Sequence, residues 1–188
     1  MLKVNEIFYS IQGEGEYTGT PMTFIRLAEC NLNCPFCDTR YDTFTEMEEE
    51  AILAEVQKNP TMYVLLTGGE PLLQDVKKLM KILSNDYLLH LETNGMFTVP
   101  ADFDYTCVSP KNTQVLTYNL TMAESVKYLC GIDNWLDIIK YCSKFVTGRQ
   151  YLQPLSKDKE LTQQAIEFVK QYPEFNLSVQ MHKYINVR

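Results

Sequence analysis

The alternation of strand-like and helix-like segments is the feature that most limits what this chain can fold into. Short apolar runs predict strands at 22–27, 63–67, 87–91, 105–108, 126–130 and 177–181. Apolar residues at helical spacing predict helices over 45–58, 71–83, 135–141 and 161–172. Repeated β–α units predict an α/β fold with a mostly parallel sheet and right-handed crossovers. About six strands would form an incomplete (β/α)6-like barrel, because a closed barrel of this kind has eight.

Four motifs follow the first four predicted strands of this sheet. Cys30, Gly68, Thr93 and Ser109 each stand just after a strand-like run. Because functional residues in such folds gather at the carboxyl ends of the strands, we expect these motifs to share one end of the sheet.

Three closely spaced cysteines, Cys30, Cys34 and Cys37, form the first of these motifs. A 4Fe–4S cluster usually takes four thiolates, so three would leave one iron open to a ligand. A zinc site is the alternative, but zinc normally requires a further protein ligand from a second Cys/His pair. His90 and His182 are distant in sequence and form no such pair. The spacing therefore favours a reactive iron–sulfur cluster.

The composition bounds the class of protein. With 188 residues, 45% of them hydrophobic, we expect a single domain over 1–188 that folds without disulfides. Free thiols require a reducing compartment, and no signal peptide or membrane-spanning run is apparent, so we expect a cytoplasmic protein that uses no membrane. The net charge of −7 disfavours a nucleic-acid partner and favours a small-molecule substrate.

Two further segments carry local signals. In Thr67-Gly68-Gly69-Glu70-Pro71, the glycines let the backbone approach a ligand closely, and Pro71 suits the first turn of a helix. An ordinary strand–helix turn, with Glu70 structural at the helix N-terminus, is the alternative. Within the acidic run 46–50, Thr45 and Glu48 fit a capping box at the start of a helix.

The stretch from Cys30 to Cys37, with Phe36 before its last cysteine, resembles the cluster motif of radical S-adenosylmethionine (SAM) enzymes. The resemblance implies a radical SAM barrel and a 4Fe–4S cluster bound by the three cysteines. SAM would bind the open iron and be cleaved there to a 5′-deoxyadenosyl radical. The positions that match SAM contacts are Phe36, Gly68, Gly69, Glu70, Thr93, Ser109 and Lys111.

A longer series of motifs narrows the resemblance. The series comprises Ser10 to Gly15, Arg26, Asp38-Thr39, Leu66 to Leu72, Glu92 to Gly95, Ser109 to Lys111, Leu152 to Pro154 and Gln180 to Lys183. In this order, along nearly the whole chain, the motifs resemble the family of 7-carboxy-7-deazaguanine synthases. One departure is Glu29, which precedes Cys30 where that family commonly has a glycine.

This resemblance implies a specific reaction. It implies a carbon–nitrogen lyase that converts 6-carboxy-5,6,7,8-tetrahydropterin to 7-carboxy-7-deazaguanine with loss of ammonia, in 7-deazapurine synthesis such as that of queuosine. It further implies Mg²⁺ at the position of Thr39, a homodimer, and an electron donor such as flavodoxin.

The expected substrate suggests which side chains bind it. Arg26 offers a planar fork for the pterin carboxylate, and Gln12 and Glu14 offer acceptors for the N–H groups of the ring edge. We expect His182 to contact the substrate from the end of the last strand, and place Thr67 and Glu92 in the same site. Alternatively, Arg26 is an ordinary ion-pair partner and His182 a surface histidine.

Two other functions share part of this pattern. One is a radical SAM activase for a glycyl-radical enzyme, which shares the cysteine spacing. The other is a non-catalytic iron–sulfur protein, and the glycine-rich motif counts against it because such a protein needs no SAM motif. Among the remaining candidate ligands, we expect His90 to be structural because it lies inside a strand-like run. We expect Cys107, Cys130 and Cys142 to be packed thiols.

Overall fold

The computed structural model describes residues 1–39 and 42–187, and its chain divides into two compact units. Unit 1 comprises residues 1–10, 21–93 and 99–106, and unit 2 comprises residues 11–20, 94–98 and 107–188. The prediction that the chain is a single domain remains a prediction.

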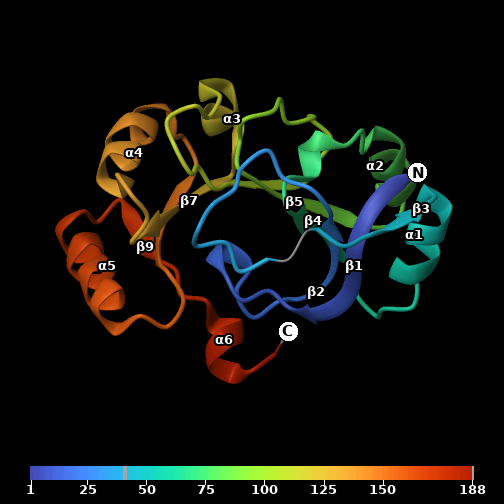
Figure 1. Cartoon of the computed structure of the whole chain (residues 1–188), viewed down its shortest axis with the longest axis horizontal. Coiled ribbons are helices and arrows are strands. Elements are labelled where there is room, and N and C mark those ends of the chain that lie inside the picture. The colour runs from blue at the N-terminus through green and yellow to red at the C-terminus, as the bar shows by residue number, and fades with distance from the viewer. Residues whose placement is uncertain (40–41, 188) are drawn as a thin grey trace. The chain divides into compact units, whose positions relative to one another are not determined.

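Unit 1 is a mixed sheet with two α-helices (Figure 1). Its strands are β1 (Leu2–Ile11), β2 (Pro21–Leu27), β3 (Thr45–Met47), β4 (Tyr63–Gly68) and β5 (Leu88–Thr93). They follow the order β3-β1-β2-β4-β5, in which β2, β4 and β5 pair in parallel and β3 pairs antiparallel with β1. The helices α1 (Glu49–Val56) and α2 (Lys77–Leu83) pack against each other. Ile25, Leu66 and Leu79 are fully buried in the core of this unit.

Unit 2 consists of parallel β–α units. Its strands are β6 (Tyr105–Val108, which begins in unit 1), β7 (Ser125–Cys130), β8 (Arg149–Pro154) and β9 (Phe175–Leu177), and each pairs in parallel with the next. Its helices are α3 (Thr117–Met122), α4 (Trp135–Cys142), α5 (Lys159–Gln171) and α6 (Met181–Ile185), with short 3-10 turns η1 (Gly15–Tyr17) and η3 (Ser143–Phe145). Phe168 of α5 packs edge-on against Phe175 of β9, with ring centroids 5.2 Å apart. Neither unit closes its strands into a ring, so the open α/β architecture is confirmed.

The predicted helix over 45–58 was wrong in its first part. Thr45–Met47 forms β3, which pairs with residues 2–4 of β1 in the register Leu2↔Met47. Glu48 precedes α1 without a side-chain capping bond, so the capping box does not form. The edge of β1 has open hydrogen-bonding groups. Pairing with them outweighs a short capping signal. Acidic residues in the first turn of the helix are confirmed, because Glu49 and Glu50 occupy it.

Two other element boundaries differ from the prediction. The helix predicted over 71–83 is divided into η2 (Pro71–Leu73) and α2, because the backbone of Gln74 is extended. The Gln74 side chain donates to the carbonyls of Lys3 and Ala28 at 3.1 and 3.2 Å. The last predicted strand, 177–181, ends at Leu177, and residues 181–185 form α6 instead. Strands β1 and β8 and helix α3 were not predicted at all.

The packed histidine and cysteines are confirmed. His90 lies in β5 between the rings of Tyr63 and Tyr105, at centroid distances of 5.5 and 5.0 Å, and burial lowers its pKa to about 4. Burial also raises the pKa of the Cys130 and Cys142 thiols to about 11. Cys107 is buried as well. Groups with such pKa values are uncharged near neutral pH, which fits a structural role.

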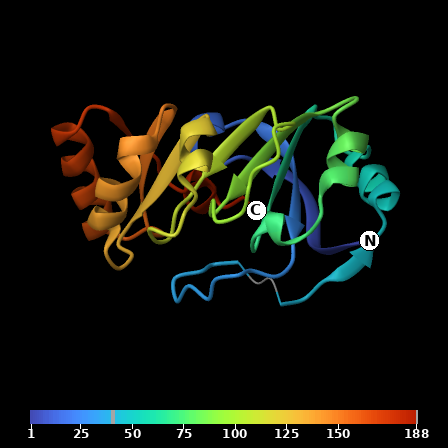
Figure 2. The same ribbon diagram turned by 90° about the horizontal axis from the view of Figure 1, so that it is seen from above.

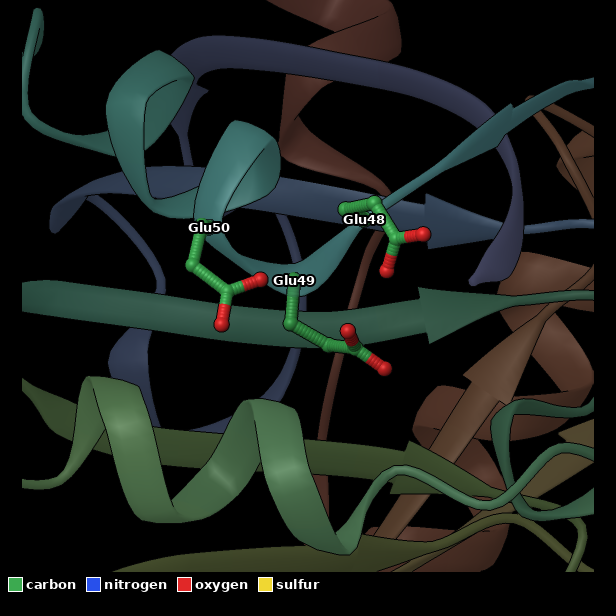
Figure 3. Close-up of side chains that lie close together, drawn as sticks. All are labelled: Glu48, Glu49 and Glu50. Atoms are coloured by element: carbon green, nitrogen blue, oxygen red, sulfur yellow. The ribbon is translucent and has the colours of Figure 1, made fainter.

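Three consecutive carboxylates, Glu48, Glu49 and Glu50, gather at the start of α1 (Figure 3). Lys78 of α2 binds Glu49 at 2.9 Å and Glu50 at 3.1 Å, and the amino group of Met1 lies 3.8 Å from Glu49. The three carboxylates are therefore paired with the Met1 amino group and Lys78, and the Lys78 ion pairs link α1 to α2. Among residues 1–39 and 42–187, no helix is long and apolar enough to cross a membrane.

Candidate active site

The three predicted cluster ligands lie on the loop that leaves β2 in unit 1, drawn in pale blue in Figure 2. Cys30 and Cys34 are half-buried and Cys37 is exposed, and all three are free thiols. The amide of Leu32 donates to Cys30 Sγ at 3.4 Å, and the amide of Cys37 donates to the carbonyl of Cys34 at 3.1 Å. Two backbone amides of the loop therefore donate within the loop, one to a sulfur atom and one to a carbonyl.

The pKa of the Cys30 thiol is raised above its ordinary value. Burial raises the pKa of Cys30, and the negative charges of Glu70, Cys34 and Cys37 raise it further. Such a group of thiolates is unfavourable without a cation and favourable with one, because a bound metal stabilises each thiolate. Three soft, accessible sulfur donors on one loop fit an iron–sulfur cluster.

The glycine-rich motif lies against the start of the cysteine loop. The amide of Gly69 donates to the carbonyl of Leu27 at 3.1 Å, and that of Glu70 donates to the carbonyl of Glu29 at 2.9 Å. A Cβ on Gly69 would lie 1.8 Å from the Glu29 oxygen, and one on Gly68 would lie 2.1 Å from the Leu27 oxygen. These two glycines therefore allow a close approach to the backbone of Leu27 and Glu29.

Glu70 is fully buried and has structural partners in unit 1. Its Oε1 accepts from Thr93 Oγ1 at 2.7 Å and from the amide of Leu72 at 3.1 Å, so it caps η2. Pro71 occupies the first position of that turn, as predicted. The structural alternative for Glu70 is thus observed, whereas contact with SAM remains a prediction.

Arg26 and Thr39, predicted to bind substrate and metal, lie together in unit 1. Arg26 Nη1 donates to Thr39 Oγ1 at 3.3 Å, and Arg26 Nε binds Glu6 Oε1 at 2.8 Å. The guanidinium also lies over the Phe8 ring, 5.7 Å from its centroid. Sequence reasoning considered an ion pair for Arg26 but did not identify Glu6, because β1 was not predicted. Thr67 lies opposite Arg26 in the register of β4.

Three other predicted residues occupy unit 1. Glu92 is half-buried near the end of β5, next to the buried Thr93, and Phe36 is half-buried on the cysteine loop. With Gly68, Gly69 and Glu70, these residues gather at the carboxyl ends of β2, β4 and β5. That placement matches the expectation for a parallel sheet.

Glu14 is the centre of a polar network in unit 2. Its Oε2 accepts a short hydrogen bond from Lys127 Nζ, and its Oε1 accepts from Gln180 Nε2 at 2.8 Å. Burial alone would raise the pKa of Glu14, but the charge of Lys127 and the surrounding donors hold it below its ordinary value. Sequence reasoning missed Lys127, although a lysine inside an apolar strand-like run is itself an unusual signal.

The other predicted substrate contacts of unit 2 surround the same loop. Gln12 is buried and its Oε1 accepts from the amide of Glu14 at 3.2 Å. His182 lies on α6 and not at the end of a strand, and its Nδ1 is 2.2 Å from the point that a Gly13 Cβ would occupy. The amide of Met181 donates to the carbonyl of Gly13 at 2.9 Å. The glycine is therefore needed for α6 to lie against this loop.

Ser109 and Lys111, predicted to contact SAM, also lie in unit 2. Lys111 Nζ donates to Ser109 Oγ at 2.6 Å, and Ser109 Oγ donates to the backbone carbonyl of Lys127 at 2.9 Å. These bonds join the loop after β6 to β7, where Lys127 contacts Glu14.

Comparisons with known proteins show which proteins the chain is similar to. Residues 25–105 match the Radical SAM superfamily. A 7-carboxy-7-deazaguanine synthase from Bacteroides thetaiotaomicron is 39% identical over the full length of both chains. One from Haemophilus influenzae is 33% identical over 97% of this chain and 92% of its own. A crystal structure of QueE from Escherichia coli superimposes with a TM-score of 0.85 at 28% identity, covering 96% of this chain and 94% of that one.

Proposed function

The chain belongs to the family of 7-carboxy-7-deazaguanine synthases, radical SAM enzymes of deazapurine biosynthesis, and we propose that its substrate is 6-carboxy-5,6,7,8-tetrahydropterin. This family uses a 4Fe–4S cluster and SAM. The observation that carries the proposal is full-length identity of 39% combined with three free cysteines on the loop after β2. Neither a glycyl-radical activase nor a non-catalytic iron–sulfur protein accounts for both.

The test is anaerobic reconstitution followed by incubation with SAM, a reductant and the carboxytetrahydropterin. We expect 7-carboxy-7-deazaguanine and ammonia in equal amounts. SAM cleavage without either product would exclude the proposed substrate while leaving the radical SAM chemistry intact.

Cys30, Cys34 and Cys37 would hold the cluster through their thiolates. When bound, the cluster and SAM supply the radical hydrogen abstraction at C6 of the pterin that begins ring contraction. We expect Cys37→Ala to lose SAM cleavage, because a missing thiolate removes one ligand of the iron. Full iron content and cleavage in this variant would contradict the assignment.

The proposed role of Arg26 is to bind the substrate carboxylate. Glu6 and Thr39 hold the Nε and Nη1 groups of its guanidinium, and this fixes the plane of the fork. Planar, bidentate recognition is lost in Arg26→Lys even though the charge remains. We expect that variant to bind the pterin about one to two decades more weakly, with uncoupled SAM cleavage preserved. Parent-like affinity in Arg26→Ala would show that the carboxylate binds elsewhere.

Thr39 is proposed to contribute its hydroxyl oxygen to Mg²⁺, with substrate oxygens and water completing the shell. A hydroxyl has two acceptor lone pairs, and the bond from Arg26 uses one of them. The ion would orient the substrate and stabilise negative charge during rearrangement. We expect chelation to slow turnover, added Mg²⁺ to restore it, and Thr39→Ala to weaken this dependence without loss of iron.

The remaining assignments divide between the two units. In unit 2, Gln12 and Glu14 would bind the pterin ring edge and His182 would also contact the substrate, and in unit 1 Thr67 and Glu92 are proposed substrate contacts. The proposed SAM contacts are Phe36, Gly68, Gly69, Glu70, Thr93, Ser109 and Lys111.

Its cellular setting is proposed from the same chemistry. Free cysteines suit a reducing cytoplasm, where a flavodoxin-type protein would donate the electron. We propose a homodimer whose protomers each fold as a single domain. A single calorimetric transition and a dimeric mass in solution are the expected results.

A further inference from the structure

Lys127 is a buried lysine that sequence reasoning assigned to no function. It lies within β7, and its side chain is 5% exposed. Buried ammonium groups are retained when they are paired, since an unpaired charge in the interior is strongly unfavourable. Its Nζ donates to Glu14 Oε2, so these two charges, which are 113 residues apart in the chain, are partners.

Two neutral amides complete the surroundings of the Glu14 carboxylate. The Oε1 atom of Gln180 accepts from Lys183 Nζ at 2.8 Å and from the amide of Ser156 at 3.0 Å, so its NH₂ group faces Glu14. The Oε1 atom of Gln153 accepts from Ser178 Oγ at 2.7 Å, which leaves its NH₂ group as a donor, and Gln153 helps to lower the pKa of Glu14. Both amides are therefore oriented as donors toward the same carboxylate.

This arrangement leaves little acceptor capacity on Glu14. A carboxylate has about four lone-pair sites, and Lys127 uses one on Oε2 while Gln180 uses one on Oε1. The remaining acceptor sites have a fixed direction, because the two donors come from different parts of unit 2 and hold both oxygens. A ligand with an N–H edge would meet a pre-oriented acceptor.

We propose that Lys127 is a positioning residue that keeps Glu14 ionised and directs its remaining lone pair at an N–H group of a fused-ring heterocyclic substrate. This inference rests on the proposed substrate-binding role of Glu14. Lys127 itself does not touch the reacting atoms, and it acts through the carboxylate that it binds.

The charge of Lys127 opposes the effect of burial on Glu14. Burial raises the pKa of that carboxyl, and the charge and hydrogen bond of Lys127, together with the amides of Gln153 and Gln180, lower it below its ordinary value. The nearby charged groups have other partners: Lys183 binds Gln180, and Arg149 lies 3.4 Å from Glu16. Without Lys127, Glu14 would therefore gain a proton at a higher pH and lose acceptor capacity.

The test compares substrate binding by the reconstituted holoenzyme from about pH 6 to pH 8.5. The parent should show no pH dependence from Glu14. In Lys127→Met, the affinity should fall by up to about tenfold per pH unit below the raised pKa of Glu14. Glu14→Gln in the same background should remove this dependence, and Lys140→Met, an exposed lysine on α4, should match the parent. A pH-independent, parent-like affinity in Lys127→Met would overturn the proposal.

A second measurement does not depend on substrate or on the folding of Lys127→Met. Carbon-13 NMR should show the Glu14 carboxyl of the parent and of Lys127→Arg titrating below its ordinary value of 4.5. Titration at or above that value in the parent would overturn the inference. Parent-like substrate affinity in Glu14→Gln would instead refute the substrate role of Glu14, and the NMR result would still report whether Lys127 keeps it ionised.

Discussion

Replacing Gly69 with alanine tests whether the glycine-rich motif holds the cysteine loop in place. The new Cβ would lie 1.8 Å from the Glu29 carbonyl oxygen and 3.1 Å from Cys30 Cβ. Because the first obstacle is backbone and not a flexible side-chain end, the two segments must move apart. The 2.9 Å hydrogen bond from the Glu70 amide to the same oxygen would then break.

The loss in free energy of unfolding follows from the steric overlap and from the broken hydrogen bond. Overpacking of this kind costs about 1–3 kcal/mol, and the lost hydrogen bond adds about 0.5–1.5 kcal/mol. We therefore expect the free energy of unfolding to fall by about 1.5–4.5 kcal/mol. Since Cys30 follows Glu29 directly, the same movement displaces one thiolate relative to Cys34 and Cys37, and iron content should fall as well.

Urea unfolding and iron content after anaerobic reconstitution measure both effects. The matched control is Gly19→Ala, because Gly19 has a φ of +94° but no atom within 4 Å of the position that an alanine methyl would take. That variant should lose about 1–2 kcal/mol through backbone strain while its iron content stays at the parent level. Parent-like unfolding and iron content in Gly69→Ala would refute the reasoning.

Three further predictions concern single groups. Glu29 has a φ of 69°, so the free energy of unfolding of Glu29→Gly should exceed that of Glu29→Ala by about 1 kcal/mol. Equal urea midpoints for the two variants would contradict this. Burial lowers the pKa of His90 from 6.5 to about 4, so the unfolded chain binds the proton more readily in that interval. The free energy of unfolding should thus fall by up to about 1.4 kcal/mol per pH unit on acidification through it, and urea titrations should show this slope reduced in His90→Asn. Alkylation of the folded apoprotein at about pH 8 should modify the exposed Cys37 and spare Cys142, whose burial keeps its thiol protonated, as mass spectrometry would show.

The parts of the fold that were predictable from sequence are those with local signals. Strands β2, β4 and β6 are mostly apolar, and the cysteine spacing is read from eight consecutive residues. Strand β1 was missed because polar residues such as Lys3 and Glu6 interrupt its apolar pattern. Its stability comes instead from pairing with other segments, which no local window contains.

The partners of the candidate site residues were unpredictable for the same reason. Arg26 and Glu6 are 20 residues apart, and Glu14 and Lys127 are 113 apart. Residue type indicates that a buried charge needs a partner, but only the fold selects it. His182 was misplaced because the alternation of apolar and polar residues over 177–181 predicts a strand, whereas β9 ends at Leu177 and α6 begins at Met181.

The cysteine loop and the glycine-rich motif are joined by backbone hydrogen bonds. Glu29 occupies a left-handed conformation, which suits glycine best. The chain keeps that conformation with a glutamate whose carboxylate binds Lys3 at 2.7 Å, while its carbonyl accepts from Glu70 at 2.9 Å. Gly69 leaves the space that this contact requires. The backbone bond from Glu70 to Glu29, which directly precedes Cys30, therefore links the glycine-rich motif to the start of the cysteine loop.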